Sequence, residues 1–215
     1  MIEYIEAHDI DIVCLSESSN FNFSECLPER FPYEHSFLSS DTYLGKRGYK
    51  FNICSSKEVT YTPVNYYIEH ELFNSDYDLM LKDYGQDTII SIKVCDKEIV
   101  PVHIQYPGTK YSSPYTLYYE LGIRTLINYM ENYAPIVVCG DFNNYPGDTT
   151  FGNIEQLKSY RNANTDINAY SYIASQGSSK LLLDHTFTNS NDVKMEYVPA
   201  IEKGVFDHNG MLITL

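Results

Sequence analysis

Short apolar runs, each about the length of a β-strand, are the feature that most constrains the fold of this chain. They are separated by polar and turn-forming residues, and each is too short to span a membrane as a helix. Runs of this length and composition are typical of buried strands, so we expect a protein built largely on β-sheet. The predicted strands cover residues 10–15, 50–54, 88–95, 98–104, 136–139, 181–188, 193–198 and 211–215.

One long segment follows the spacing of a helix instead. Ser113-Pro114 is a typical helix start, and apolar residues recur at i, i+3, i+4 and i+7, namely at positions 123, 126, 127 and 130. Pro135 then ends this helix, and a first, short helix is expected over residues 1–8. Strands joined by hairpins, with helices between some of them, indicate an α+β fold. The length of 215 residues fits a single domain over residues 1–215.

The remaining long segments are predicted to form loops. Residues 18–50 are rich in Ser, Asn, Pro and aromatic residues, which are common in turns. Residues 69–87 carry a series of Asp and Glu side chains. We interpret this acidic segment as a solvated loop or hairpin, which is more common than a second metal site.

The cysteines and the start of the chain bear on its compartment. Cys14, Cys54, Cys95 and Cys139 lie inside apolar runs, so we expect them to be small buried residues. There is no C-x-x-C pair, which argues against a zinc site or a redox dithiol and favours a reducing compartment. The first residues lack the cationic and apolar regions of a signal peptide. We therefore expect a cytoplasmic protein without a transmembrane segment.

The charge of the chain limits its partners. The formal net charge is -14, and the sequence has no run of basic residues. Tight, non-specific binding of long nucleic-acid duplexes usually needs a basic face, so we do not expect it here. A nuclease remains compatible with this charge, because a bound divalent cation can supply positive charge locally.

Polar motifs stand where the apolar runs end. The first run leads into Glu17, another ends at His103, and a third continues as Gly-Asp-Phe-Asn over residues 140–143. Two Asp-His steps, Asp184-His185 and Asp207-His208, lie near the last strands. Ligands in layered folds are usually met at strand ends and by the loops that follow them. We therefore expect these side chains to form one hard-cation site with an acid–base partner.

Strand alternation predicts the direction of several side chains. Asp141 and Asn143 lie two residues apart, so in extended geometry both face the site while Phe142 points into the core. The residues from Asn143 onward are also typical of a turn, which would directly follow the site. His185 should face away from Asp184 and is interpreted as structural, whereas three other histidines are expected at the surface: His8, His35 and His70.

In this order, the motifs resemble those of the endonuclease/exonuclease/phosphatase superfamily, the metal-dependent phosphodiesterases related to pancreatic-type deoxyribonuclease. The resemblance covers almost the whole chain, from about residue 9 to Leu215. It implies a four-layer α/β/β/α sandwich of the deoxyribonuclease-like type. The matching stretches are residues 11–17, His103, residues 140–143, residues 183–187 and residues 206–208.

The resemblance implies two metal-binding carboxylates and two groups that act on water and phosphate. Glu17 and Asp207 would bind Mg²⁺ or Mn²⁺, which is held by few protein ligands and keeps several waters. Asp141 would orient or deprotonate the attacking water, and Asn143 would bind a phosphate oxygen. Without the other motifs, a carboxylate such as Glu17 would be interpreted only as a rim residue at a strand exit.

The three other catalytic residues implied by the resemblance are His103, Asp184 and His208. His208 would contact the phosphate and help to activate water, and Asp184 would hydrogen-bond His208 and raise its pKa. His103 would touch the scissile phosphate and protonate or stabilise the leaving oxygen. The residues by themselves leave two alternatives open, a loop for a single Asp-His step and a satisfied core histidine for His103.

Two departures from the family pattern stand out. Phe206 occupies a position that is usually Ser. Residues 1–8 do not match the opening family strand, which carries an Asn metal ligand, so we expect the chain to begin after that strand. An open strand position exposes unpaired backbone groups. We therefore expect weak metal binding, and a homo-oligomer or a strand-donating partner that fills the gap.

The resemblance implies a metal-dependent phosphodiester hydrolase acting on a phosphate ester, with nucleic acid among the candidate substrates. The Trp-Cys-Asp-Arg signature of inositol phosphatases is absent, because residues 181–185 read Leu-Leu-Leu-Asp-His. The remaining candidates are nucleases, general phosphodiesterases and tyrosyl-DNA-phosphodiesterase-like or sphingomyelinase-like members. The alternative is a catalytically weak or inactive relative that acts as a binding or scaffold module.

Overall fold

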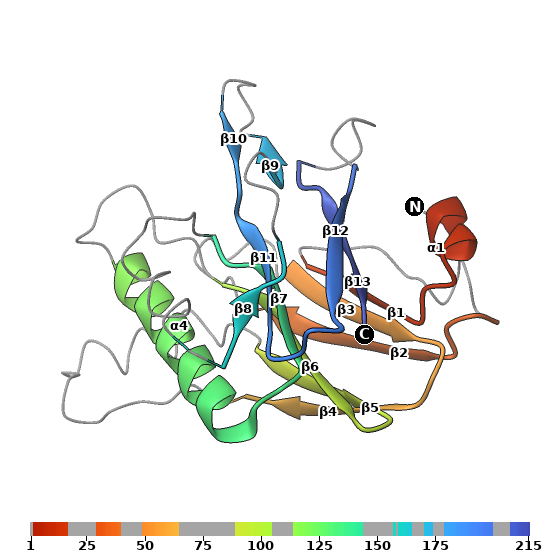
Figure 1. Ribbon diagram of the computed structural model, residues 1–215, viewed down its shortest axis with the longest axis horizontal. Helices are drawn as coiled ribbons and strands as arrows, with labels where there is room; N and C mark the ends of the chain where they lie inside the picture. The colour runs from red at the N-terminus through yellow and green to blue at the C-terminus, as the bar shows by residue number, and fades with distance from the viewer. Residues whose placement is uncertain are drawn as a thin grey trace.

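The computed structural model describes residues 2–16, 29–39, 49–64, 89–104, 114–143, 157, 159–164, 170–173, 179–199 and 207–215. These residues form a six-stranded sheet, a three-stranded sheet and two small two-stranded sheets, together with two helices (Figure 1). The helices are α1 (Ile2–Ala7) and α4 (Pro114–Tyr133). The strands of the chain, in order, are β1 (Ile12–Leu15), β2 (Tyr33–Ser39), β3 (Tyr49–Ser55), β4 (Val59–Pro63), β5 (Ile90–Val94), β6 (Lys97–His103), β7 (Val137–Asp141), β8 (Arg161–Asn162), β9 (Tyr172–Ile173), β10 (Lys180–Leu181), β11 (Asp184–Thr188), β12 (Lys194–Val198) and β13 (Gly210–Thr214).

The six-stranded sheet has the order β4-β5-β6-β7-β11-β8. All its neighbours are antiparallel except β6 and β7, which run parallel and are connected by α4. Parallel neighbours need such a crossover, because a tight turn cannot return the chain to the same end of the sheet. As a consequence β6 and β7 both end at the same edge, where their last residues meet the start of the antiparallel β11.

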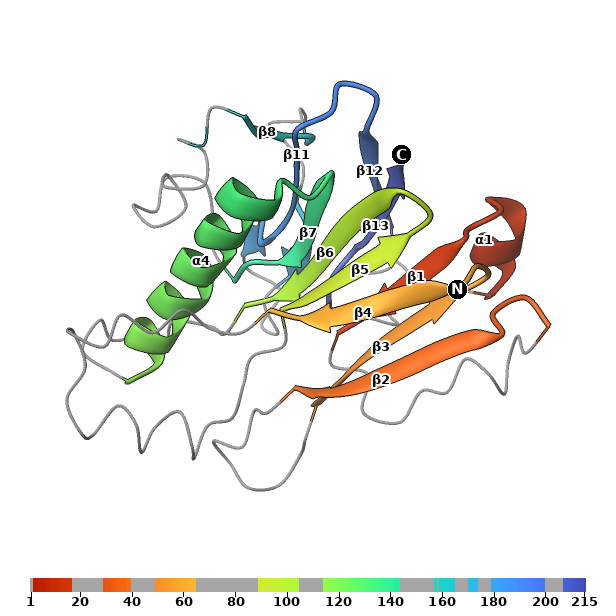
Figure 2. The ribbon, with the colours of Figure 1, turned by 90° about the horizontal axis from the view of Figure 1, so that it is seen from below.

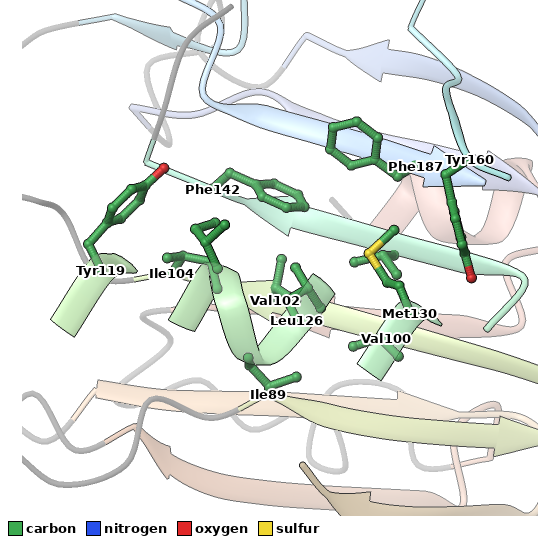
Figure 3. Packing of buried hydrophobic residues seen from close by; sticks show 12 residues of the cluster. Ile89, Val100, Val102, Ile104, Tyr119, Leu126, Met130, Phe142, Tyr160 and Phe187 are labelled. Atoms are coloured by element: carbon green, nitrogen blue, oxygen red, sulfur yellow. The ribbon is translucent and has the colours of Figure 1, made fainter. Parts of the chain in front are cut away.

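Helix α4 covers one face of the six-stranded sheet, and the main core lies between them (Figures 2 and 3). The predicted helix stripe is confirmed there, because Ile123, Leu126 and Met130 are all buried against the sheet. From the strands, Val102 of β6 and Val138 of β7 face the helix and are also buried. Burying a side chain of this size stabilises the fold by about 1.5–3 kcal/mol, so this core holds the edge of the sheet in place.

The three-stranded sheet, of order β1-β3-β2, packs against the other face of the six-stranded sheet. Contact is made by Ile53 of β3, which is buried against Ile90 and Ile92 of β5. On its far face this sheet is covered by α1, since Ile5 packs on Phe31 and on Cys54 of β3. Figure 2 shows the resulting succession of α4, two sheets and α1.

The prediction of loops over residues 18–50 is wrong for part of that segment. Strand β2 lies within it and pairs antiparallel with β3 along its whole length, from Tyr33 opposite Ser55 to Ser39 opposite Tyr49. This stretch is an edge strand of the described sheet, and Tyr33, His35 and Ser36 are exposed, so its polar and aromatic composition resembled that of a loop. The segment 69–87 and His70 lie outside the described residues.

The prediction that four cysteines are buried holds for Cys54 only. Cys14 and Cys95 are exposed, and Cys139 is half-buried. Cys95 follows β5 at a φ of 54° in the turn to β6, and it is exposed there. Cys14 alternates with Val13 and Leu15, which pack toward α1, so its side chain points to the other face of β1. The described cysteines are all free.

No helix within the described residues is long and apolar enough to cross a membrane. Of the histidines expected at the surface, His8 and His35 are exposed. His185 is fully buried beside Phe142 and Phe187, in agreement with a structural role.

Candidate active site

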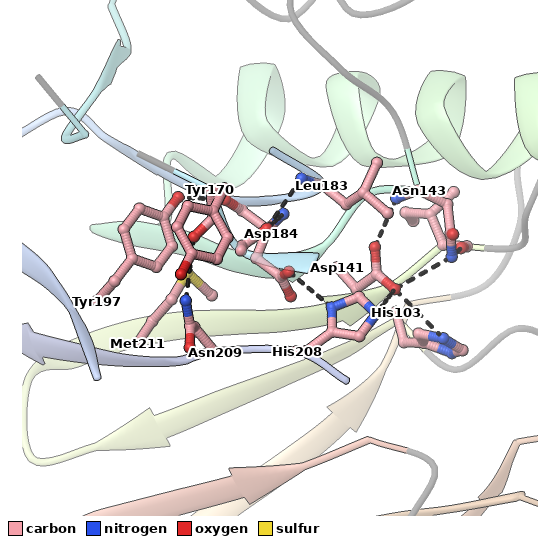
Figure 4. Close-up of polar contacts among 12 residues, drawn as sticks. His103, Asp141, Asn143, Tyr170, Leu183, Asp184, Tyr197, His208, Asn209 and Met211 are labelled. Carbon is pink, nitrogen blue, oxygen red and sulfur yellow. Dashed lines mark hydrogen bonds and ion pairs between the residues drawn. The ribbon is translucent and has the colours of Figure 1, made fainter. Parts of the chain in front are cut away.

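Three neighbouring strands place three predicted site residues in one row. His103 is the last residue of β6 and lies opposite Asp141, the last residue of β7. Asp141 in turn lies opposite Asp184, the first residue of β11. Because the parallel pair ends where the antiparallel strand begins, residues far apart in the chain meet there, with Asp141 between His103 and Asp184 (Figure 4). The sheet topology is therefore what assembles this part of the site.

Gly140 allows β6 and β7 to approach closely next to this row. Its φ is 140°, and a Cβ atom added there would lie 1.9 Å from the backbone oxygen of Val102. That position excludes every residue with a side chain unless the two strands separate. The Gly-Asp step therefore combines Gly140, which the close approach of the two strands requires, with Asp141, a candidate catalytic residue.

Asn143 holds the carboxylate of Asp141. The backbone N–H of Asn143 donates to Asp141 Oδ1 at 2.7 Å, and its side-chain Nδ2 lies 3.2 Å from Asp141 Oδ2. The same Nδ2 donates to the backbone oxygen of Ile104 at 2.8 Å, just past the end of β6. The expected extended geometry is wrong at Asn143, which has a φ of 48°. The chain bends at Asn143, and the Asp141 side chain accepts the N–H there, as aspartates commonly do in turns.

His208 completes the cluster from a different part of the chain. Its Nδ1 lies 2.8 Å from Asp184 Oδ2, and its Nε2 lies 4.0 Å from Asp141 Oδ2. On the other side, His103 Nε2 lies 3.8 Å from the same Asp141 oxygen. Asp141 therefore lies between two imidazoles, and the side chains of both aspartates are at most 10% exposed. A neutral His208 that donates Nδ1–H to Asp184 would present an unprotonated Nε2 toward Asp141 and the solvent.

The surroundings raise the pKa of both Asp141 and His208, for different physical reasons. Burial, together with the negative charge of Asp184, raises the pKa of Asp141 to about 7, although His103, His208 and the Asn143 N–H lower it in part. Burial lowers the pKa of His208, but the hydrogen bond and charge of Asp184 and the charges of Asp141 and Asp207 outweigh it and raise that pKa to about 9. Perturbed values of this kind are common at functional sites.

Five of the seven predicted site residues come together in this cluster: His103, Asp141, Asn143, Asp184 and His208. Glu17 lies outside the described residues, and Asp207 is described as an exposed residue next to His208. Within the part of the chain that the structure describes, no three His, Cys, Asp or Glu side chains gather closely enough to hold a metal ion. Glu17 and Asp207 carry carboxylates, which Mg²⁺ prefers as ligands, and Mg²⁺ is usually held by only a few protein carboxylates.

Two tyrosines and one serine contact the site and were not predicted. The ring of Tyr172 lies 4.7 Å from the ring of His208, and Tyr197 donates to the backbone oxygen of Asp184 at 2.6 Å. Ser171, beside Tyr172, accepts backbone hydrogen bonds from Asp184 and Leu183. For Ser171 and Tyr172 the sequence signal was a short alternation of aromatic and polar residues over 170–173, which is too brief to distinguish from a loop. Tyr197 lies in the predicted strand over residues 193–198, whose pattern does not point to the site.

The chain matches known proteins in both sequence pattern and fold. The sequence pattern of the Endonuclease/Exonuclease/phosphatase family matches residues 1–205. No curated protein sequence matches the chain. An AP endonuclease from Archaeoglobus fulgidus superimposes with a TM-score of 0.67 at 15% identity, covering 100% of this chain and 92% of that one.

Two further solved structures share the fold. The 3' phosphatase NExo from Neisseria, bound to a product DNA hairpin, has a TM-score of 0.64 at 16% identity and covers 100% of this chain and 92% of its own. A humanized TDP2 from D. rerio has a TM-score of 0.62 at 16% identity, with 100% and 89% covered. These likenesses show that the chain has the deoxyribonuclease I-like fold.

Proposed function

Since this chain belongs to the endonuclease/exonuclease/phosphatase family, we propose that it is a metal-dependent phosphodiester hydrolase. The observation that supports this most directly is the position of Asp141 between His103 and His208, with His208 held by Asp184. A buried carboxylate flanked by two imidazoles provides a proton acceptor and two ring N–H groups within reach of one reacting group.

The pKa values divide the acid and base roles between Asp141 and His208. With a pKa of about 7, Asp141 is partly ionised at neutral pH and can accept a proton from the attacking water. With a pKa of about 9, His208 is protonated there, so we assign it to contact a phosphate oxygen and stabilise its growing negative charge. His103, on the other side of Asp141, is assigned to the leaving oxygen.

Asn143 is assigned to hold Asp141 rather than to bind phosphate in this state of the protein. Both hydrogens of its side-chain amide are engaged, one by Ile104 and one by Asp141. Binding a phosphate oxygen would require Asn143 to release the longer contact, that of 3.2 Å to Asp141. The amide therefore fixes the carboxylate that accepts the proton.

Glu17 and Asp207 would hold the metal ion in this proposal. A bound Mg²⁺ or Mn²⁺ neutralises charge on the phosphate oxygens and on the leaving group. Two carboxylates leave room for waters and for substrate oxygens, as Mg²⁺ requires.

We further propose that the substrate is a small phosphodiester or the end of a nucleic-acid strand. The net charge of -14 disfavours long duplexes, and the similar NExo and TDP2 structures are described with product DNA. The free cysteines fit a cytoplasmic location. The order of α4, two sheets and α1 fits a four-layer sandwich over a single domain.

Hydrolysis of bis(4-nitrophenyl) phosphate with Mg²⁺ tests the proposal. His208→Ala and Asp141→Ala should each lower the rate by roughly 10²- to 10⁴-fold, since both groups act on protons or charge in the transition state. His8→Ala is the matched control, because His8 is exposed and bonds only to Tyr4 of its own helix turn in the described contacts. Activity that survives EDTA, or that both site variants retain, would contradict the proposal. A folded wild-type chain without activity on any phosphodiester would favour the binding or scaffold module.

A further inference from the structure

Asp184 lies in the six-stranded sheet whereas His208 lies outside it, so their hydrogen bond depends on contacts that hold the two segments together. Asp184 begins β11 of the six-stranded sheet. His208 lies just before β13, which pairs with β12 in a separate two-stranded sheet. Among the described residues, these two sheets share no strand pairing. The segment 170–173 lies between them and contacts both.

Ser171 bonds to the Asp184 side of this pair through its hydroxyl. Its side chain is fully buried, and its Oγ accepts hydrogen bonds from the backbone N–H groups of Leu183 and Asp184, both at 2.9 Å. These two N–H groups lie at the break between β10 and β11, where the predicted continuous strand over residues 181–188 is interrupted. The Ser171 hydroxyl therefore supplies the acceptor that a neighbouring strand would otherwise provide, directly at the backbone of Asp184.

The backbone of the same residue bonds to the His208 side. The carbonyl oxygen of Ser171 accepts the N–H of Asn209 at 2.7 Å, and the N–H of Ile173 donates to Asp207 at 3.1 Å. Together they form a short antiparallel bridge in which Tyr172 lies opposite His208. Figure 4 shows Asp184 and His208 facing each other, with Leu183 and Asn209, the outer partners of these bonds, close by.

We propose that Ser171 is a positioning residue that joins the Asp184 backbone to the His208 backbone and so sets the hydrogen bond between their side chains. The role rests on the proposed function only in that the pair is taken to serve phosphodiester hydrolysis. Replacing the hydroxyl leaves two buried N–H groups without an acceptor, and the break between β10 and β11 must then shift to satisfy them. A misplacement of about 1 Å can lower a rate by roughly 100-fold, so even a partial shift is measurable.

Steady-state kinetics on bis(4-nitrophenyl) phosphate with Mg²⁺ separate positioning from general stability. Ser171→Ala should lower kcat by roughly 10-fold and leave KM within about 2-fold, because the pair acts in the chemical step. Ser171→Thr keeps the acceptor oxygen and should retain most of the rate. When Ser171→Ala is added to the Asp184→Asn variant, kcat should fall by less than about a further 2-fold, since the effect of Ser171 is transmitted through Asp184. Equal losses in both backgrounds would overturn the proposal.

Thr188→Val is the matched control. Thr188 is the last residue of β11 and is fully buried. Its hydroxyl donates to Ile136 at 2.7 Å and accepts from the Ser190 N–H at 3.1 Å, at the far end of the strand from Asp184. This variant should lose thermal stability while keeping kcat. If Ser171→Ala does not fold, Ser171→Cys takes its place, because sulfur is a weak acceptor of similar size. A kcat loss in Thr188→Val equal to that in the Ser171 variant would overturn a specific role.

Amide hydrogen exchange tests the same inference without any substrate. In Ser171→Ala the amides of Leu183, Asp184 and Asn209 should all exchange at least about 10-fold faster than in Thr188→Val. Unchanged exchange at Asn209 would overturn the proposal, because the start of β11 and the segment before β13 would then be held independently of each other. If the wild-type chain hydrolyses no phosphodiester, the proposed function fails while the exchange experiment still decides the role of Ser171.

Discussion

Asp141 is a carboxylate almost removed from water, next to a second carboxylate and between two imidazoles. Its raised pKa follows from that environment, because burial and a like charge both disfavour the ionised form. His208 shows the opposite balance, since its acidic neighbours outweigh the effect of its burial. At the scale of residues both pKa values are raised, so that near neutral pH Asp141 is partly ionised and His208 is protonated, which separates the base from the acid.

The rate of hydrolysis should have a bell-shaped dependence on pH. It should rise as Asp141 ionises at about pH 7 and fall as His208 loses its proton at about pH 9. Asp184→Asn removes the charge that raises the pKa of His208 and leaves at most a neutral hydrogen bond, so the falling limb should move toward the ordinary value of 6.5. The measurement is kcat/KM against pH for both proteins, with His8→Ala as the unshifted control. An unmoved falling limb would assign it to another group.

Asp141→Asn should stabilise the metal-free protein at high pH although it abolishes activity. The folded-state pKa of Asp141 is raised from 3.8 to about 7, so its ionisation opposes folding. The stability that protonated Asp141 contributes is fully present below pH 3.8 and is lost as the pH rises through about 7. The asparagine cannot ionise, and the variant should therefore have the higher Tm at about pH 8 in EDTA, by a few degrees, with little difference near pH 4. A lower Tm at both pH values would show that the ionised Asp141 is well compensated.

His208 should contribute to stability with the same direction of pH dependence as Asp141, but over a higher pH range. Its folded-state pKa is raised from 6.5 to about 9, so its contribution is fully present below 6.5 and is lost as pH rises through 9. His208→Gln should accordingly lower the Tm at about pH 6 and approach the wild type above pH 9, in the same thermal unfolding series. A constant difference across this range would mean that packing, not charge, accounts for the effect.

The parallel pair of β6 and β7 is the element that decides the geometry of the site. Both strands end at the same edge of the sheet because α4 returns the chain between them, and Gly140 lets them approach there. A second connection ties the helix to these strands, since Glu98 of β6 accepts hydrogen bonds from Tyr129 of α4 and from Ser91 of β5. The row of His103, Asp141 and Asp184 depends on this register being kept.

Gly140→Ala should disrupt this register. Its Cβ would lie 1.9 Å from the Val102 oxygen, and the φ of 140° is strained for any side chain. We expect a loss of roughly 3 kcal/mol in the free energy of unfolding, from overpacking and backbone strain together, and a loss of most activity. Gly210→Ala in β13 is the control, because its added Cβ meets Val198 at an ordinary 3.5 Å. Urea denaturation measures both, and equal effects of the two substitutions would argue against the steric account.

At the scale of the whole molecule, two cores share the six-stranded sheet. One lies between the sheet and α4, and the other lies between the sheet and β3 of the three-stranded sheet. Because β5, which packs on β3, pairs with β6, which packs on α4, the two cores share one sheet, and loosening either core should expose the other. The molecule should therefore behave as one cooperative unit, in agreement with the single domain that we propose.

Ile53→Ala and Leu126→Ala test this cooperativity, because they lie in the two different cores. Each substitution should lower the free energy of unfolding by about 2–5 kcal/mol, and each should shift one common unfolding transition. Far-UV circular dichroism and tyrosine fluorescence should report coincident midpoints in both variants. Arg124→Ala, on the exposed side of α4, should change stability by no more than about 0.5 kcal/mol. Two separated transitions in either core variant would contradict the single unit.

The sequence by itself determined the local features of this protein. The periodicity of residues 123–130 determined α4 and its buried stripe, and the apolar runs determined most strands of the six-stranded sheet to within a few residues. The order of the motifs predicted the family, which the pattern match over residues 1–205 shows. These features are local or linear, because an apolar run or a motif can be recognised without knowing what packs against it.

The tertiary structure alone decided which distant residues meet and how they are held. The pairing of β2 with β3, the left-handed turn at Asn143 and the exposure of Cys14 depend on partners far away in the chain. The role of Ser171 could not be foreseen for the same reason, because its hydroxyl has an acceptor function only where β10 breaks from β11. Burial likewise sets the pKa of Asp141, and burial is a property of the assembled fold rather than of the residues next to it.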